Sequence, residues 1–156
     1  MTSPATTVAL HCIPGSVGLI EDLPILSHGK IRLKLAGYRH DPERDLPLYL
    51  FDVVTESGEV AGQYHFTPGA EDRVGDIGNS GGHVDQSFRN RGLSSDAIRA
   101  LKPLASLHGM QSFVITCGKD NGAAQTALRK LGVEYPQEQL FKYRIPADHS
   151  SPIDAP

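Results

Sequence analysis

Hydrophobic and polar residues alternate in several short stretches of the chain, and such alternation predicts β-strands with one buried face. Residues 31–35 alternate apolar and basic side chains, and residues 48–54 are rich in β-forming types. Residues 60–66 follow the Ser57-Gly58 turn, so this stretch and the one before it predict a hairpin. Residues 140–145 alternate again and predict a closing strand.

The spacing becomes helical in the second half of the chain. Residues 93–108 carry apolar side chains at helical intervals, and Gly109 is a suitable C-terminal stop. Residues 124–131 repeat this spacing, with Asp120 or Asn121 as the N-cap of a second helix.

Two further apolar segments flank the first predicted helix. Residues 77–84 predict a strand that contains Gly78, Gly81 and Gly82, and glycine inside a strand often marks a bulge or a close backbone contact with a ligand. Residues 112–117 are rich in β-branched types and predict another strand. Antiparallel strands followed by strand–helix–strand–helix–strand predict an α/β fold. We expect an α+β-type sandwich with a mixed, mostly antiparallel sheet and flanking helices.

The remaining segments set the expected domain limits. Residues 1–8 predict a disordered N-terminal tail, and residues 146–156, rich in Pro, Ser and Asp, predict a disordered C-terminal tail. Glycines and prolines argue against a long helix in residues 10–29, and residues 68–76 predict a charged loop. Residues 9–145 are expected to form a single domain.

Composition narrows the class of protein. A net charge of −3 does not indicate a nucleic-acid surface. No apolar run approaches the roughly 20 residues of a membrane helix, and no secretory signal is visible. Cys12 and Cys117 have no paired spacing, so free thiols in the cytoplasm are expected, with a disulfide as the alternative. The histidines show no metal-ligand spacing, so no metal is expected.

The richest candidate chemistry is the run Arg89-Asn90-Arg91-Gly92-Leu93-Ser94 at the start of the first helix. The first four amides of a helix lack partners inside it, and the helix dipole adds roughly half a positive charge there. Gly92 lets a ligand approach the backbone closely, and two arginines flank the turn. This combination predicts a phosphate or pyrophosphate pocket, although both arginines could simply be solvated surface charges.

The same run resembles a family signature. The segment from His83 to Leu93 looks like the "V-x-P-x-Y/F-R-G-R-G-L/I" pattern of the GNAT superfamily, the acetyl-CoA-dependent N-acetyltransferases. Residues 120–124, followed by residues 128–132, are similar to the family's "N-x-x-A/S…E-K-L-G-F/A" segment. The strand at residues 113–117 lies between the two motifs, as in the family. The resemblance covers roughly residues 47 to 145.

This resemblance implies an acyl-CoA N-acyltransferase-like fold with a central, splayed parallel strand pair. It implies transfer of acetyl from acetyl-CoA to a primary amine of a small molecule or peptide, by direct attack in a ternary complex. A homodimer is compatible with it. The cofactor-binding residues that it implies are Arg89, Asn90, Arg91, Gly92, Leu93 and Ser94 for the pyrophosphate, His83, Val84 and Asp85 for the pantetheine arm, and Asn121 for the arm or an ordered water.

The catalytic groups are less well defined by the resemblance. The backbone N–H of Val84 is the candidate oxyanion donor. His83 and Asp76 are candidate bases, but a structural histidine and a turn aspartate are the alternatives. Leu128 stands where many members have an acid tyrosine, which leaves water, Ser94 or Tyr143 for that role.

Two features bear on how the family pattern applies here. Asn90 replaces a common glycine, and asparagine tolerates left-handed backbone better than most residues. The Pro/Gly-broken N-terminal region and a short last hairpin, around residues 134–139, suggest an open acceptor cleft.

A catalytically inactive acyl-CoA sensor or interaction module is the main alternative function. A nucleotide-phosphate site is disfavoured, since no Walker lysine follows the glycine.

Overall fold

The computed structural model describes residues 18–136 and 140–147 of the chain. Eight strands form one sheet, in the order β1-β2-β3-β4-β5-β6-β8-β7. The strands are β1 (Leu26–His28), β2 (Ile31–Asp41), β3 (Leu46–Thr55), β4 (Val60–Phe66), β5 (Ser80–Val84), β6 (Ser112–Gly118), β7 (Val133–Pro136) and β8 (Leu140–Pro146). The helices are α1 (Glu71–Val74), α2 (Leu93–Leu107) and α3 (Gly122–Arg129), with 3-10 turns η2 (Gly75–Ile77) and η3 (Gln86–Phe88).

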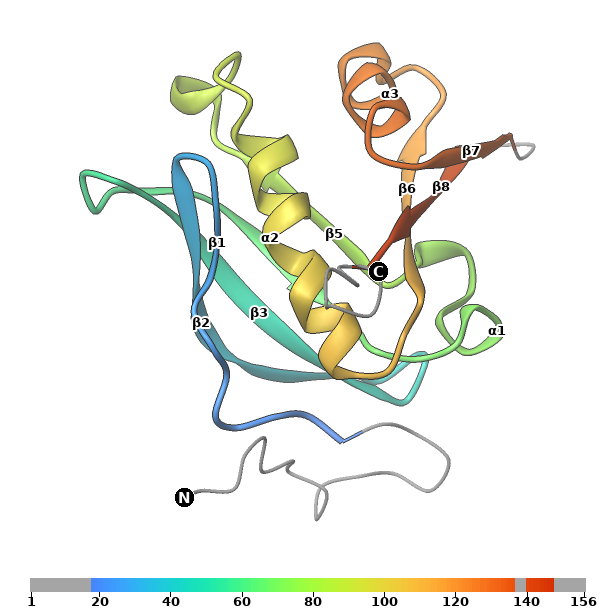
Figure 1. Ribbon diagram of the computed structural model, residues 1–156. Helices are drawn as coiled ribbons and strands as arrows, with labels where there is room; N and C mark the ends of the chain where they lie inside the picture. Colours follow the sequence, from blue (N-terminus) through green and yellow to red (C-terminus); the bar gives the residue numbers. More distant parts are fainter. Residues whose placement is uncertain (1–17, 137–139, 148–156) are drawn as a thin grey trace, which may run out of the picture.

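One strand pair in this sheet is parallel, and it is barely paired. β5 and β6 share a single register pair, Ser80 with Ile115, while every other neighbouring pair runs antiparallel. Just before this point Asn79 clamps the two strands, because its N–H donates to the Val114 carbonyl and its Oδ1 accepts from the Val114 N–H, both at 2.8 Å. Beyond the clamp the strands diverge toward the ends of β5 and β6 (Figure 1). The predicted mixed sheet with a splayed parallel pair is confirmed.

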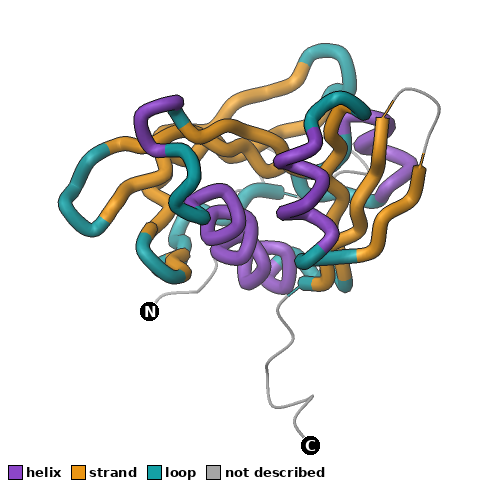
Figure 2. Tube along the Cα trace, turned by 90° about the horizontal axis from the view of Figure 1, so that it is seen from above, coloured by secondary structure: helices purple, strands orange, loops and turns teal. Residues whose placement is uncertain are grey.

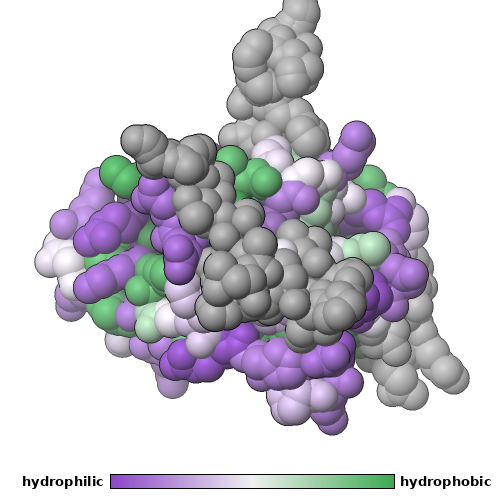
Figure 3. Space-filling view, turned by 90° about the horizontal axis from the view of Figure 1, so that it is seen from below, coloured by the Kyte–Doolittle hydropathy of each residue, from purple (hydrophilic) through white to green (hydrophobic). Residues whose placement is uncertain are grey.

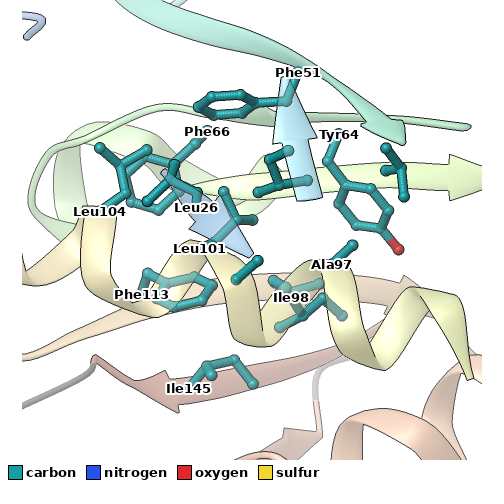
Figure 4. Packing of buried hydrophobic residues seen from close by; sticks show 14 of the residues in the cluster. Leu26, Phe51, Tyr64, Phe66, Ala97, Ile98, Leu101, Leu104, Phe113 and Ile145 are labelled. Carbon is teal, nitrogen blue, oxygen red and sulfur yellow. The ribbon is translucent and has the colours of Figure 1, made fainter. Parts of the chain in front are cut away.

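Helices α2 and α3 lie side by side on one face of the sheet (Figure 2). The apolar side chains of α2 point into the sheet, where Ala97, Ile98, Leu101 and Leu104 meet aromatic rings such as Phe66 (Figure 4). All of these residues are buried, and burying one large apolar side chain stabilises a fold by about 1.5–3 kcal/mol. This packing fixes the start of α2 relative to the end of β5, which is the geometry that the site needs.

The far end of α2 is anchored by a polar contact. Nε2 of His108, the C-cap residue, lies 2.7 Å from the hydroxyl of Tyr49 on β3. That same hydroxyl accepts the Ile20 N–H at 2.7 Å. Gly109 follows in the left-handed conformation (φ 75°), which confirms the predicted helix stop.

The predictions for residues 68–79 and 146–147 were partly wrong. The predicted charged loop contains α1 and η2, and β5 begins at Ser80 rather than at residue 77. Glu71 in α1 pairs with Lys142 at 3.1 Å and with Arg144, and these partners are distant in sequence. Pro146 belongs to β8, and the Ala147 N–H donates to the Gln111 carbonyl at 3.0 Å, so these two residues of the predicted tail are ordered parts of the fold.

Two expectations concern segments outside the described residues. The predicted tail at residues 1–8 lies there, as do Cys12 and residues 148–156. In the described ranges no helix has the length and apolar character that crossing a membrane requires. Seen from below, the visible coloured surface is mostly hydrophilic, with hydrophobic residues in small areas (Figure 3).

Candidate active site

The diverging strands leave a cleft of about 580 Å³ between β5, β6 and the first turns of α2 and α3. The cleft opens on the side of the sheet that carries both helices, because side chains from each of them line it. Its lining includes Gly82, His83, Val84, Arg89, Asn90, Gly92, Leu93, Ser94, Asn121 and Leu128. Most of the residues predicted to bind the cofactor are therefore brought together at one place.

One edge of β5 is free along this cleft. The Asp85 N–H donates to the Ala61 carbonyl at 2.7 Å, toward β4. Because bonding groups alternate along an antiparallel strand, the amides of Gly82 and Val84 face the opposite side, toward the diverging β6. The Val84 carbonyl on that side accepts Nε of Arg89 at 3.1 Å. The Val84 amide, predicted as the oxyanion donor, thus faces the cleft, and the Gly82 amide does so as well.

The turn before α2 exposes its backbone amides. Asn90 (φ 65°) and Gly92 (φ 75°) are both left-handed, which confirms that asparagine is tolerated in place of glycine here. The first helical bond runs from the Asp96 N–H to the Gly92 carbonyl at 3.1 Å. The amides of residues 93–95 therefore donate to no acceptor in the described part of the chain. A side chain at Gly92 would point into open space, so the turn is accessible to a ligand.

The side chains beside these amides are held in place. Arg91 stacks over the Phe88 ring, with its guanidinium carbon 5.3 Å from the ring centroid. Ser94 Oγ accepts the hydroxyl of Tyr64 at 3.2 Å. Tyr64, which the sequence did not single out as a site residue, lines the cleft, and burial raises the pKa of its phenol, so it remains protonated.

Helix α3 forms the opposite wall. Asn121 Oδ1 accepts the Ala124 N–H at 3.2 Å, so the predicted N-cap is confirmed, and Asn121 also lines the cleft. Small side chains of α3 face the cleft at Ala123, Ala124 and Ala127. Leu128 is 3% exposed and lines the same wall, so an apolar group occupies the place of the expected acid.

The candidate catalytic side chains are scattered. His83 is exposed, and its Nε2 lies 3.2 Å from Oδ1 of Asp85. Asp76 belongs to η2, before the clamp between β5 and β6, and its side chain is not among the described ones. Tyr143 on β8 is buried and is not part of the cleft lining.

Tyr143 belongs to a separate polar cluster. Its hydroxyl donates to Oε2 of Glu134 at 2.5 Å, and the same carboxyl oxygen accepts Nε of Arg129 at 2.9 Å. Burial, followed by the hydrogen bond to Glu134, raises the pKa of Tyr143 well above its ordinary value. The neighbouring Cys117 thiol lines the cleft, and burial raises its pKa. The Tyr143 hydroxyl thus donates to Glu134 within this cluster.

The face of the sheet opposite α2, called the far face below, carries a histidine that the sequence left unassigned. His65 on β4 is half-buried, and its register partner on β5 is Gly81. A Cβ at Gly81 would lie 3.1 Å from the His65 ring, so the ring rests against the Gly81 backbone. Neither motif contains His65, and only the strand pairing could have brought it to the site.

Comparison with known proteins identifies the fold. No family model and no curated protein matches the sequence. Among solved structures, the chain is similar to apo RimL, a ribosomal L7/L12 alpha-N-protein acetyltransferase, in its crystal form 2. The TM-score is 0.54 at 18% identity, covering 79% of this chain and 98% of that one. Crystal form I of RimL matches with a TM-score of 0.46 at 20% identity, covering 64% of this chain and 60% of that one.

The likeness to crystal form 2 concerns the fold. The mostly antiparallel eight-stranded sheet of the described residues, with one parallel pair and helices on one face, matches a GNAT-like acyltransferase fold. The chain has the GNAT fold, as the sequence motifs predicted. In the described ranges no cluster of three His, Cys, Asp or Glu side chains could hold a metal ion.

Proposed function

We propose that the protein is an N-acetyltransferase that transfers acetyl from acetyl-CoA to a primary amine in a ternary complex. One observation supports this above all. The free edge of β5 and the exposed amides at the start of α2 line one continuous cleft. A diphosphate joined to an extended arm with amide groups would match both parts of that cleft, and coenzyme A has this composition.

The residues of the cleft suit such a ligand. The left-handed turn at Asn90 and Gly92 and the free amides of residues 93–95 would hold the pyrophosphate, helped by the helix dipole. Arg91 and Arg89 would add positive charge beside it. The pantetheine arm would lie along the free edge of β5, with Asn121 on the opposite wall.

The chain would contribute orientation and polarisation. When bound, acetyl-CoA would supply the activated acetyl thioester. The amides of Gly82 and Val84 face the cleft, so a thioester carbonyl bound beside them would gain a hydrogen-bond donor. One well-placed donor of this kind lowers a barrier by about 3–4 kcal/mol. Holding two reactants in one cleft lowers the entropic part of the barrier further.

The leaving thiolate needs a proton from elsewhere. Leu128 has no proton to give, and the Tyr143 hydroxyl donates a hydrogen bond to Glu134. We infer that solvent or Ser94, which lines the cleft, supplies it. The alternative function, an acyl-CoA sensor without catalysis, would need no such donor.

The acceptor would approach from the far face, since α2 and α3 cover the other side. Among the described residues no helix precedes α1, so no helix from that part of the chain covers the β2–β3 hairpin on the far face. RimL is a ribosomal L7/L12 alpha-N-protein acetyltransferase. We propose an exposed amine of a peptide or small molecule as the acceptor, and the cytoplasm as the location.

Binding of CoA to the cleft can be tested with one charge. Gly92→Asp places a carboxylate at the proposed pyrophosphate site, so CoA affinity measured by calorimetry should fall more than tenfold, about 1.4 kcal/mol. Gly109→Asp is the matched control, because Gly109 has the same φ of 75° and equally open surroundings at the other end of α2. The control should bind CoA like the wild type, and equal affinity in all three proteins would exclude this cleft.

Turnover separates the enzyme from the sensor. Thiol release from acetyl-CoA is followed with a panel of short peptides bearing free α-amino or lysine groups, together with small primary amines. Release that depends on the amine, with an acetylated product confirmed by mass, is expected. Tight CoA binding without turnover on any amine would favour the sensor.

A further inference from the structure

We propose that His65 is the general base of the acetyl transfer, taking the proton from the acceptor amine at the point where β5 and β6 separate. This inference rests on the proposed function and names a proton acceptor for it. It differs from the candidates that the sequence suggests, which are His83 and Asp76.

The position of His65 follows from the strand register. His65 pairs with Gly81, and Gln63 pairs with His83, so all four residues lie on the far face, away from α2. Gly81 is one residue beyond Ser80, the last point at which β5 pairs with β6. The His65 ring lies over Gly81, where a Cβ would come within 3.1 Å of it. The absence of a side chain at Gly81 thus makes room for the ring at the beginning of the split.

The reacting end of the cofactor should lie at the same depth. The pyrophosphate site is at the start of α2, beyond the C-terminal end of β5, so the arm would run back along β5 toward the clamp at Asn79. The thioester is the terminal group of that arm and would therefore reach deepest. The last free amide before the split closes is that of Gly82, the immediate neighbour of Gly81.

His83 is less well placed for the same role. It lies two residues further along β5, roughly 7 Å from Gly81 along the strand and nearer the mouth of the cleft. Its imidazole is exposed and paired with Asp85. His65 is half-buried against the Gly81 backbone, where solvent competes less for its free nitrogen.

The surroundings of His65 keep its imidazole neutral. Burial is the main cause that lowers the pKa of His65, and the nearby Arg44 guanidinium lowers it further. Asp41 and a hydrogen bond with the Gly81 backbone act in the opposite direction. Arg44 is fixed by its bonds to the Val74 and Gly78 carbonyls, at 3.0 and 2.9 Å. On β5 the ionisable neighbour of His65 is His83, two residues beyond Gly81 on the same face of the sheet. A neutral imidazole at pH 7 can accept a proton.

The step balances as follows. The ammonium form of the acceptor gives one proton to His65, directly or through one water, and becomes a neutral amine. The amine nitrogen forms a bond to the acetyl carbonyl carbon, and the carbon–sulfur bond breaks with its electron pair leaving on sulfur. The nitrogen loses its second proton, the thiolate gains one, and the imidazolium releases its proton to solvent.

The test compares His65→Gln with His83→Gln, using acetyl-CoA and the most active amine of the peptide panel. We expect His65→Gln to lower kcat by roughly 10²–10⁴-fold, since this is the usual contribution of a general base. The wild-type kcat should fall on the acidic side of pH 6.5, and this acidic limb should be absent from the residual activity of His65→Gln. His83→Gln should keep the acidic limb, whatever its kcat, because His83 is not the proton acceptor in this proposal. A His65→Gln protein with wild-type kcat, or loss of the limb only in His83→Gln, would overturn the proposal.

A second variant guards against simple misfolding. Gly81→Ala would push the ring aside without removing it, so kcat should fall less than in His65→Gln while the acidic limb persists. His65→Gln should bind CoA with wild-type affinity, because His65 is not among the residues that line the cleft. If the wild type acetylates amines and His65→Gln does so equally well, this inference alone fails. If the wild type acetylates no amine, the proposed function fails and this inference with it.

Discussion

Two adjacent glycines in β5 lack side chains for different reasons, although both lie beside the proposed reaction centre. At Gly82 a Cβ would lie 2.3 Å from the Gln63 carbonyl oxygen and 2.7 Å from the Tyr64 Cα, so it would collide with the backbone of β4. At Gly81 the nearest atom belongs to the His65 ring, which can turn away. Gly82 therefore secures the pairing of β4 and β5, and Gly81 leaves room for an imidazole.

This difference predicts that Gly82→Ala is far more damaging than Gly81→Ala. Forcing a methyl into a packed backbone contact costs about 1–3 kcal/mol, so the free energy of unfolding of Gly82→Ala should fall by that amount in a urea titration. Gly122→Ala is a suitable control, because Gly122 begins α3 with open space around its Cα and alanine favours a helix by about 1 kcal/mol. An unchanged midpoint for Gly82→Ala would contradict the tight pairing.

Individual residues also show where sequence reasoning worked and where it stopped. The left-handed conformations of Asn90 and Gly92 and the cap at Asn121 were predictable, because each depends on local backbone chemistry. The position of His65 was not, since it results from the register between β4 and β5. The role of Tyr143 was equally hidden, because its partner Glu134 lies on a neighbouring strand.

Among the elements, α2 connects the cleft to the opposite end of the molecule. Its first turn provides the amides of the anion site, and its C-cap His108 bonds to Tyr49 on β3. Burial lowers the pKa of His108 to about 4, so the folded protein holds a neutral imidazole there at neutral pH. In the unfolded chain the same group takes up a proton below about pH 6.5.

The protein should therefore lose stability as the pH falls from about 6.5 to 4, where the unfolded state binds the extra proton. The shift corresponds to at most about 3 kcal/mol for this group. His108→Gln keeps a hydrogen-bonding side chain but does not titrate, so its unfolding free energy should change less over this range than that of the wild type. Denaturant titrations at several pH values measure both. Parallel curves for the two proteins would show that His108 is not the responsible group.

Other elements were predicted from periodicity, where the pattern extended over at least five residues. Helices α2 and α3 and the β3–β4 hairpin were expected close to their observed positions. The short strand β1 and helix α1 were missed, because three or four residues give too little pattern to detect. Long-range contacts hold α1 in place, through Glu71 to β8 and through Arg44 to the Val74 carbonyl.

At the scale of the whole molecule, the clamp at Asn79 gives the two ends of the sheet different structures. At the clamped end the strands are continuous and the core is packed, and at the open end one edge of β5 has amides without partners in the described residues. Free strand edges normally invite pairing with another chain. Here α2 and α3 cover this edge on one side and leave a cleft, so the edge is available to an extended ligand with amide groups.

CoA binding should change hydrogen exchange at this open end in particular. In the free protein the amides of Gly82, Val84 and residues 93–95 should exchange quickly, because they donate no hydrogen bond in the described structure. Saturating CoA stabilises the whole fold by about 2.7 kcal/mol at 100 times its Kd, which slows exchange only where it depends on global unfolding. Fast exchange at these amides can be slowed only by direct contact with the ligand.

Mass spectrometry of peptides covering residues 80–95 should thus show protection, and peptides from the β2–β3 turn should show none at short exchange times. Gly92→Asp should lose the protection at the same CoA concentration. A second cavity lies at the other end of α2, where Glu71, His108 and Gln111 are among its lining residues. Protection there instead would place the ligand at the wrong end of the sheet.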